Sequence, residues 1–141
     1  MNEFAAYGHA IVAMALMGVI TLALSPLSAM RKTAAGLAPG ATPPQDYADA
    51  TYRLHRAYSN AAETVGTFAL VTLAAILAGA APFWVNLYAS VFFISRVVML
   101  IIHLRGGKAD MGARSFAYVL GWLMCLLLAI SAILAVFGGA A

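Results

Sequence analysis

Residues 53–67, with the sequence RLHRAYSNAAETVGT, place a polar stripe at the start of an otherwise apolar segment. The polar side chains recur at spacings of three and four, at Arg53, Arg56, Asn60, Glu63 and Thr67. At about 100° per residue, an α-helix brings these positions within an arc of roughly 80°. Ionisable groups inside a bilayer are costly, so they usually face a partner helix or a watery cavity and mark a functional site.

The composition around this stripe is that of a membrane protein. The chain has 141 residues, of which 64% are hydrophobic and 9% charged, whereas a soluble domain carries about 25% charged residues. We predict an integral membrane protein with one domain over residues 1–141. The net charge of +3 comes from few, dispersed basic residues, so we expect no nucleic-acid partner. The single cysteine, Cys125, excludes an intrachain disulfide framework and a Cys-rich metal site.

Four apolar runs are each long enough to cross the roughly 30 Å of a bilayer core. They cover approximately residues 4–26, 44–78, 82–104 and 113–137. We expect the first to end near Pro26 and the second to open with a capping box at Thr42-Pro43-Pro44-Gln45, which gives a helix of about 35 residues. Gly79 and Gly106 are predicted to end helices, because glycine is common just after the last helical residue. Pro82 is predicted to be the first residue of a helix. The predicted fold is all-α, a polytopic membrane four-helix bundle.

The distribution of basic residues predicts the orientation of the bundle. The connections on one side carry, or are flanked by, Arg31, Lys32, Arg53, Arg56, Arg105, Lys108 and Arg114. Both chain ends and the turn at residues 79–82 contain no Lys or Arg. Basic loops stay in the cytoplasm, so we expect both termini on the non-cytoplasmic side. The first ten residues lack the basic start of a signal peptide. We predict a multi-pass protein, in the inner (plasma) membrane if the source is bacterial.

Further polar residues fall at the depth of the stripe, in the cytoplasmic half of the bilayer. Span three contributes Arg96 and His103, and the first turns of span four contribute Arg114, Ser115 and Tyr118. This predicts a polar pocket open to the cytoplasm, rich in cations and containing one carboxylate. Arginine pairs with carboxylates through two parallel hydrogen bonds, and Glu63 would take an ammonium group. Arg114, near a helix N-terminus, would favour a thiolate.

In the identity and order of these residues, the chain resembles members of the MAPEG family, the membrane-associated proteins of eicosanoid and glutathione metabolism. The resemblance rests on Arg56-x-x-x-Asn60-x-x-Glu63, on Arg96, and on Arg114-Ser115-x-x-Tyr118. It covers nearly the whole chain. The resemblance implies a homotrimer with glutathione bound between subunits at the cytoplasmic side. It implies glutathione as co-substrate, a lipophilic small molecule as the second substrate, and no metal or prosthetic group.

The resemblance also implies roles for single residues. Arg56, Asn60 and Glu63 would hold the charged ends and backbone of glutathione, Arg114 and Ser115 would be catalytic, and Tyr118 would contribute a hydroxyl. Arg53 and Arg96 are further candidates for glutathione binding. His103 is a candidate at a position where family members commonly have a tyrosine.

Three functions remain open at the level of sequence. The first is a glutathione-dependent transferase, or a peroxidase, acting on lipophilic electrophiles. The second is a non-catalytic scaffold or lipid-binding protein that uses the same groove, because a fold does not by itself imply activity. The third is an ion or proton pathway through Glu63 and Arg96, which ranks last because the polar groups stop halfway across the membrane. For Arg96 a purely structural role, neutralising Glu63 or capping a helix, is almost as good an interpretation.

Overall fold

The computed structural model describes residues 3–106 and 111–138. Its elements are a short 3₁₀ turn, η1 (Ala5–Tyr7), and four helices, α1 (Gly8–Ala34), α2 (Ala50–Leu77), α3 (Pro82–Arg105) and α4 (Met111–Gly138). All four helices are long and apolar enough to cross a membrane, and no strand occurs in the described ranges. The predicted all-α, four-helix architecture is confirmed. Lys108, one of the residues used to predict the orientation, lies outside the described residues.

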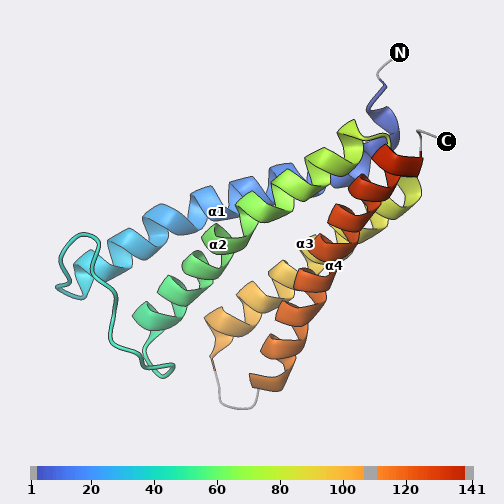
Figure 1. The fold of residues 1–141 in the computed structure, drawn as a ribbon. Helices are drawn as coiled ribbons and strands as arrows, with labels where there is room; N and C mark the ends of the chain where they lie inside the picture. Colours follow the sequence, from blue (N-terminus) through green and yellow to red (C-terminus); the bar gives the residue numbers. More distant parts are fainter. Residues whose placement is uncertain (1–2, 107–110, 139–141) are drawn as a thin grey trace.

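The bundle has two distinct ends (Figure 1). The terminal end holds η1, the turn between α2 and α3, and the end of α4; the loop end holds the α1–α2 connection and the start of α4. The α1–α2 pair and the α3–α4 pair lie close together at the terminal end and diverge toward the loop end (Figure 1). Both termini lie at one end, as predicted, while which side of the membrane they face stays a prediction.

The first helix is longer than the predicted span, because α1 continues through Pro26 to Ala34. A proline inside a helix removes one backbone hydrogen bond and clashes with the preceding turn. If the helix ended there, several backbone carbonyls would lose their hydrogen bonds within the bilayer, which offers them no donors. Continuation is therefore the less costly arrangement, and the prediction that the helix ends near Pro26 is wrong.

The second helix begins later than predicted. It starts at Ala50, after Asp49, whose side chain accepts a hydrogen bond from Thr51 N at 2.8 Å. Thr42-Pro43-Pro44-Gln45 lies in the irregular connection, so the predicted capping box is wrong. Each proline disfavours helical geometry in the residue before it, which keeps this segment extended. The helix has 28 residues rather than about 35.

The turn between α2 and α3 ends one helix and starts the next, as predicted. Gly79 has a φ of 70°, and its N–H donates to Ile76 O while that of Ala80 donates to Ala75 O, both at 3.0 Å. This is the Schellman arrangement, which favours glycine in the left-handed conformation. Pro82 then opens α3.

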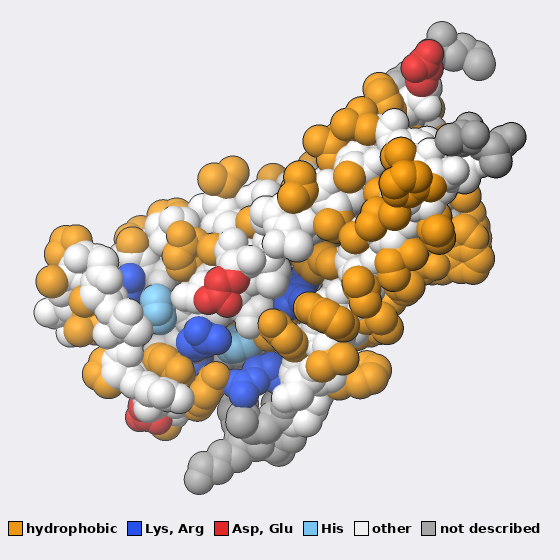
Figure 2. Space-filling view, viewed as in Figure 1, with side chains coloured by type: hydrophobic (Ala, Val, Ile, Leu, Met, Phe, Trp, Pro, Cys, Tyr) orange, Lys and Arg blue, Asp and Glu red, His pale blue; other side chains and the backbone are white. Residues whose placement is uncertain are grey.

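The core is built from small residues and stacked aromatic rings. Ala10, Ala75 and Ala89 are fully buried, and small side chains of this kind let membrane helices approach closely. The rings of Phe68 and Phe92 stack with their centroids 3.9 Å apart, which joins α2 to α3. Many large apolar side chains point outward (Figure 2), as expected of helices whose solvent is lipid.

Candidate functional site

A groove of about 360 Å³ opens between α2, α3 and α4 at the loop end. Seven of the nine predicted site residues line it, namely Arg56, Asn60, Glu63, His103, Arg114, Ser115 and Tyr118. Tyr47, Met99 and Val119 complete the lining. Figure 2 shows basic, acidic and histidine side chains gathered at this end, whereas the visible face toward the termini is mostly apolar. The divergence of the two helix pairs places these side chains around one hollow.

Three charged side chains face the groove without an ionic partner among the described residues. Glu63 is exposed and Arg56 and Arg114 are half-buried. None of the three makes a hydrogen bond or an ion pair with another described residue. Arg114 instead lies over the ring of Tyr47, with its guanidinium carbon 4.8 Å from the ring centroid. The groove therefore offers two cations and one anion to a ligand.

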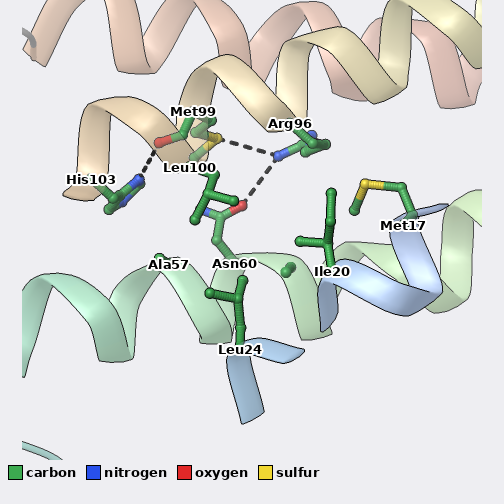
Figure 3. Close-up of a pocket in the computed structure, with 10 residues that line it drawn as sticks. Met17, Ile20, Leu24, Ala57, Asn60, Arg96, Met99, Leu100 and His103 are labelled. Carbon is green, nitrogen blue, oxygen red and sulfur yellow. Dashed lines mark hydrogen bonds between the residues drawn. The ribbon is translucent and has the colours of Figure 1, made fainter. Parts of the chain in front are cut away.

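Asn60 and Arg96 form a buried polar link beneath the groove. Arg96 Nη1 donates to Asn60 Oδ1 at 3.1 Å, which connects α3 to α2 (Figure 3). Arg96 Nη2 donates to the backbone oxygen of Tyr118 on α4 at 3.4 Å. The guanidinium also lies over the rings of Phe92 and Tyr118, at 5.0 and 5.3 Å from their centroids. Arg96 does not pair with Glu63, and its contacts are to neutral groups of three helices.

The position of Arg96 depends on a glycine in α4. A Cβ atom at Gly121 would lie 2.6 Å from Arg96 Nη2 and 2.7 Å from Ser95 Oγ. Both distances are far shorter than a van der Waals contact, so only glycine leaves room for the guanidinium at this crossing. Nothing in the apolar periodicity of α4 singles out Gly121, because its role comes from a residue on another helix.

A much smaller cavity of about 20 Å³ lies on the other side of Asn60, toward α1. Figure 3 shows Asn60, Arg96 and His103 around it, with Ile20 and Leu24 of α1 closing the far side. His103 is buried, and its Nδ1 lies 2.8 Å from Met99 O. His103 therefore borders both cavities, and the ring nitrogen bound to the backbone is not available to a ligand.

Arg53 is not part of the groove, although it shares the helical stripe. Its Nη1 donates to the backbone oxygens of Tyr47 and Ala48, at 2.8 and 2.7 Å. Its guanidinium also fills the space beside Gly106, where a Cβ atom would lie 2.9 Å from Arg53 Nε. Arg53 thus holds the α1–α2 connection and borders the end of α3, and its predicted contact with a ligand stays a prediction.

Tyr47 is a groove residue that the sequence analysis missed. In the structure it belongs to the connection before α2, whereas the predicted second span began at about residue 44. The helical spacing of that predicted span did not place Tyr47 at the groove. Its ring lies against Arg114 and 6.5 Å from the ring of His103. The Asp46–Asp49 stretch does have the composition of a turn, but only the fold shows that this turn reaches α4.

The groove has the donor set of an anion site and not of a metal site. Within the described ranges, no group of three His, Cys, Asp or Glu side chains is arranged to hold a metal ion. Arg56 and Arg114 present N–H donors that suit carboxylates and thiolates, and Glu63 accepts from an ammonium. The volume of the groove, about 360 Å³, lies within the range of about 300–1,000 Å³ that is typical of small-molecule sites.

Comparison with protein families gives a match over most of the chain. The model of the MAPEG family matches residues 10–134, from α1 into α4. No curated protein matches the chain at a significant level. Together with four helices able to span a bilayer, the family match makes this an integral, multi-pass membrane protein, as predicted. Because the match covers most of the sequence, the chain belongs to the MAPEG family.

Proposed function

We propose that the groove binds glutathione and that the protein is a glutathione-dependent transferase, with peroxidase chemistry as the related reaction of the same site. The observation that carries this proposal is the set of Arg56, Glu63 and Arg114, which face one hollow with no ionic partner in the described structure. Ionisable groups within a membrane bundle usually face a partner or a watery cavity and mark a functional site, so such a set indicates a charged ligand. Membership of a family associated with glutathione metabolism supports the choice of ligand.

The charges of glutathione match those of the groove. Arg56 would bind a carboxylate through its fork of donors, Glu63 would accept from the amino group, and the amide of Asn60 would bind the peptide backbone. Arg114 and Ser115 would then lie near the sulfur. A guanidinium close to a helix N-terminus stabilises a thiolate over a thiol.

The residues contribute positioning and charge stabilisation rather than covalent chemistry. In the proposed reaction the thiol proton leaves to water, the sulfur forms a bond to an electrophilic carbon, and the leaving group departs with its electron pair. Tyr118 lies at the groove with a hydroxyl that can donate to that leaving group. Phe116, Val119 and Trp122 on α4 are more than half exposed, and Val119 also lines the groove. A lipophilic substrate would reach the groove from the bilayer along this apolar side of α4.

We extend the proposal to a homotrimer with glutathione at the contact between subunits, on the cytoplasmic side. This rests on the family resemblance and is consistent with the exposure of Glu63 and Tyr118 at the edge of the groove. Native mass spectrometry of the detergent-purified protein would show the number of subunits. A monomer that turns over glutathione would contradict this part alone.

The test of function combines binding and turnover. Calorimetry should show heat at millimolar glutathione, and the purified protein should conjugate a chromogenic aryl halide. Arg114→Ala should lower kcat by about 100- to 1,000-fold, because removing a group that stabilises a developing or bound anion costs that much, with a smaller loss of glutathione affinity. Arg31→Ala, an exposed basic residue of α1 away from the groove, is the matched control.

Two results would overturn the proposal. Unchanged turnover in Arg114→Ala removes the catalytic role of that residue. No heat with millimolar glutathione removes the ligand, and favours the alternative of a non-catalytic scaffold or lipid-binding protein that uses the same groove.

A further inference from the structure

Arg114 is held by an aromatic ring and by no other directional contact in the described structure. Its guanidinium carbon lies 4.8 Å from the centroid of Tyr47, well inside the distance of about 6 Å at which a cation is attracted to the face of a ring. No hydrogen bond or ion pair joins Arg114 to another described residue. Without Tyr47, this long side chain would be free to take many rotamers.

Tyr47 is itself fixed from several sides. It lies in a turn closed by the hydrogen bond from Asp49 N to Asp46 O at 3.1 Å, and Asp46 Oδ1 accepts from Ala48 N at 2.8 Å. Arg53 Nη1 donates to the carbonyl of Tyr47 at 2.8 Å. The ring packs edge-on against Tyr52, with centroids 5.1 Å apart. The turn therefore presents the ring to α4 as a rigid surface.

The kind of contact matters for the chemistry of the groove. A carboxylate that held Arg114 would occupy its N–H donors and cancel its charge. A ring face contacts the flat side of the guanidinium and leaves the in-plane N–H groups free to donate. The charge is also kept, because the ring carries none. An aromatic support thus orients Arg114 and preserves its ability to stabilise an anion.

We propose that Tyr47 is the positioning residue of the groove, which holds the Arg114 guanidinium through the face of its ring and thereby sets how strongly the site favours a thiolate. This inference rests on the proposed function for its ligand. Tyr47 does not act on the reacting atoms, and its phenol oxygen has no part in the effect.

The test uses replacements of the same shape with a weaker ring face. A phenylalanine with three ring fluorines at position 47 withdraws electron density and abolishes most of the attraction for a cation. The pH at which bound glutathione forms its thiolate, followed by ultraviolet absorbance, should rise by about half a unit to one unit. Turnover at neutral pH should fall by about three- to tenfold, while glutathione affinity changes by less than about twofold.

Other groups around Arg114 stay the same in every variant, so they do not confound the pH profile. Within the part of the chain that the structure describes, they are Arg56 and Glu63 of α2, His103 of α3 and Tyr118 of α4. Tyr47→Phe keeps the ring and should keep the pH midpoint close to that of the natural protein. Tyr58→Leu removes a half-buried tyrosine of α2 that does not line the groove, and it should not move the midpoint.

A ligand-free measurement separates this inference from the proposed function. The Nε–Hε proton signal of Arg114, assigned by its loss in Arg114→Lys, should be shifted upfield by the ring current of Tyr47 and should lose that shift in Tyr47→Leu. An unshifted signal, or an equal thiolate midpoint across the fluorinated series, overturns the inference. If the natural protein binds no glutathione, the proposed function is wrong, and the ring-current comparison still decides whether Tyr47 holds Arg114.

Discussion

The molecule has a hollow at each end, and the two differ in chemistry rather than in size. The loop-end groove measures about 360 Å³ and contains Arg56, Glu63 and Arg114. The terminal-end hollow measures about 460 Å³ and is lined by Gly79, Ala80, Ala81, Trp84, Ser131, Leu134 and Ala135, with no charged side chain. The hydroxyl of Ser131 there donates to Leu127 O at 2.8 Å. Charge, not volume, distinguishes the candidate site.

The polar groups of the terminal end are used to join elements. Tyr7 Oη donates to Ala80 O at 2.7 Å and ties η1 to the α2–α3 turn. Asn86 Oδ1 accepts from Ala10 N at 3.0 Å, and its Nδ2 donates to Ala6 O at 2.8 Å. At the loop end, by contrast, Arg56, Glu63 and Arg114 have no ionic partner within residues 3–106 and 111–138. Polar groups join elements at both ends, but in the described ranges only the loop end also presents charged groups to a hollow.

The largest expected effect tests the core that supports both ends. Phe68→Ala removes one of two stacked, fully buried rings, and the free energy of unfolding in mixed detergent micelles should fall by about 3–5 kcal/mol. Leu70→Ala, a lipid-facing residue of the same helix with 70% exposure, should cost far less. Equal losses for the two variants would contradict the assigned core.

The second prediction separates binding from stability at the loop end. Arg56→Ala should weaken glutathione binding by about 10- to 100-fold, the usual loss for a charge-assisted hydrogen bond, measured by calorimetry. The free energy of unfolding should change by less than about 0.5 kcal/mol, because Arg56 has no ionic partner in the described structure. Arg105→Ala, an exposed control at the same end, should leave both quantities unchanged. A large loss of stability in Arg56→Ala would show that Arg56 has a structural role.

The third prediction tests the link beneath the groove. Gly121→Ala should lower the free energy of unfolding by about 1–3 kcal/mol, because its Cβ would overlap Arg96 and Ser95. Gly112→Ala, in the same helix with nothing within 4 Å of the added Cβ, should be neutral or slightly stabilising. The contrast between two identical substitutions in α4 is the measurement, and equal effects would rule out the predicted overlap.

The smallest effect belongs to the terminal end. Tyr7→Phe removes the buried hydrogen bond to Ala80 O and should lower the free energy of unfolding by about 1 kcal/mol. Glutathione affinity should not change. Tyr88→Phe, whose hydroxyl makes no hydrogen bond within the described structure, is the control. A change in glutathione affinity in Tyr7→Phe would show that the two ends are coupled.

Helical spacing accounts for which of the candidate residues line the groove to the extent that it determines which side chains share a face. Arg56, Asn60 and Glu63 lie on one side of α2, and Arg114, Ser115 and Tyr118 open α4, so their meeting at one groove follows from spacing and depth. Arg53 shares the same face but lies before the groove, at the level of the connection. Spacing gives the direction of a side chain and not its partner, so only the structure shows that Arg53 contacts the α1–α2 connection and that Arg96 contacts Asn60.

By itself, the sequence determined four membrane-spanning helices, the stops at Gly79 and Gly106, and the polar half of the bundle. These follow from local chemistry, because a bilayer requires long apolar helices and glycine or proline marks their ends. Only the tertiary structure showed that α1 continues through Pro26, that Gly121 leaves space for the Arg96 guanidinium, and that Arg114 lies over the ring of Tyr47. The contacts of Gly121 and of Tyr47 join residues that are far apart in the chain, and such contacts produce no helical spacing that could be recognised in the sequence.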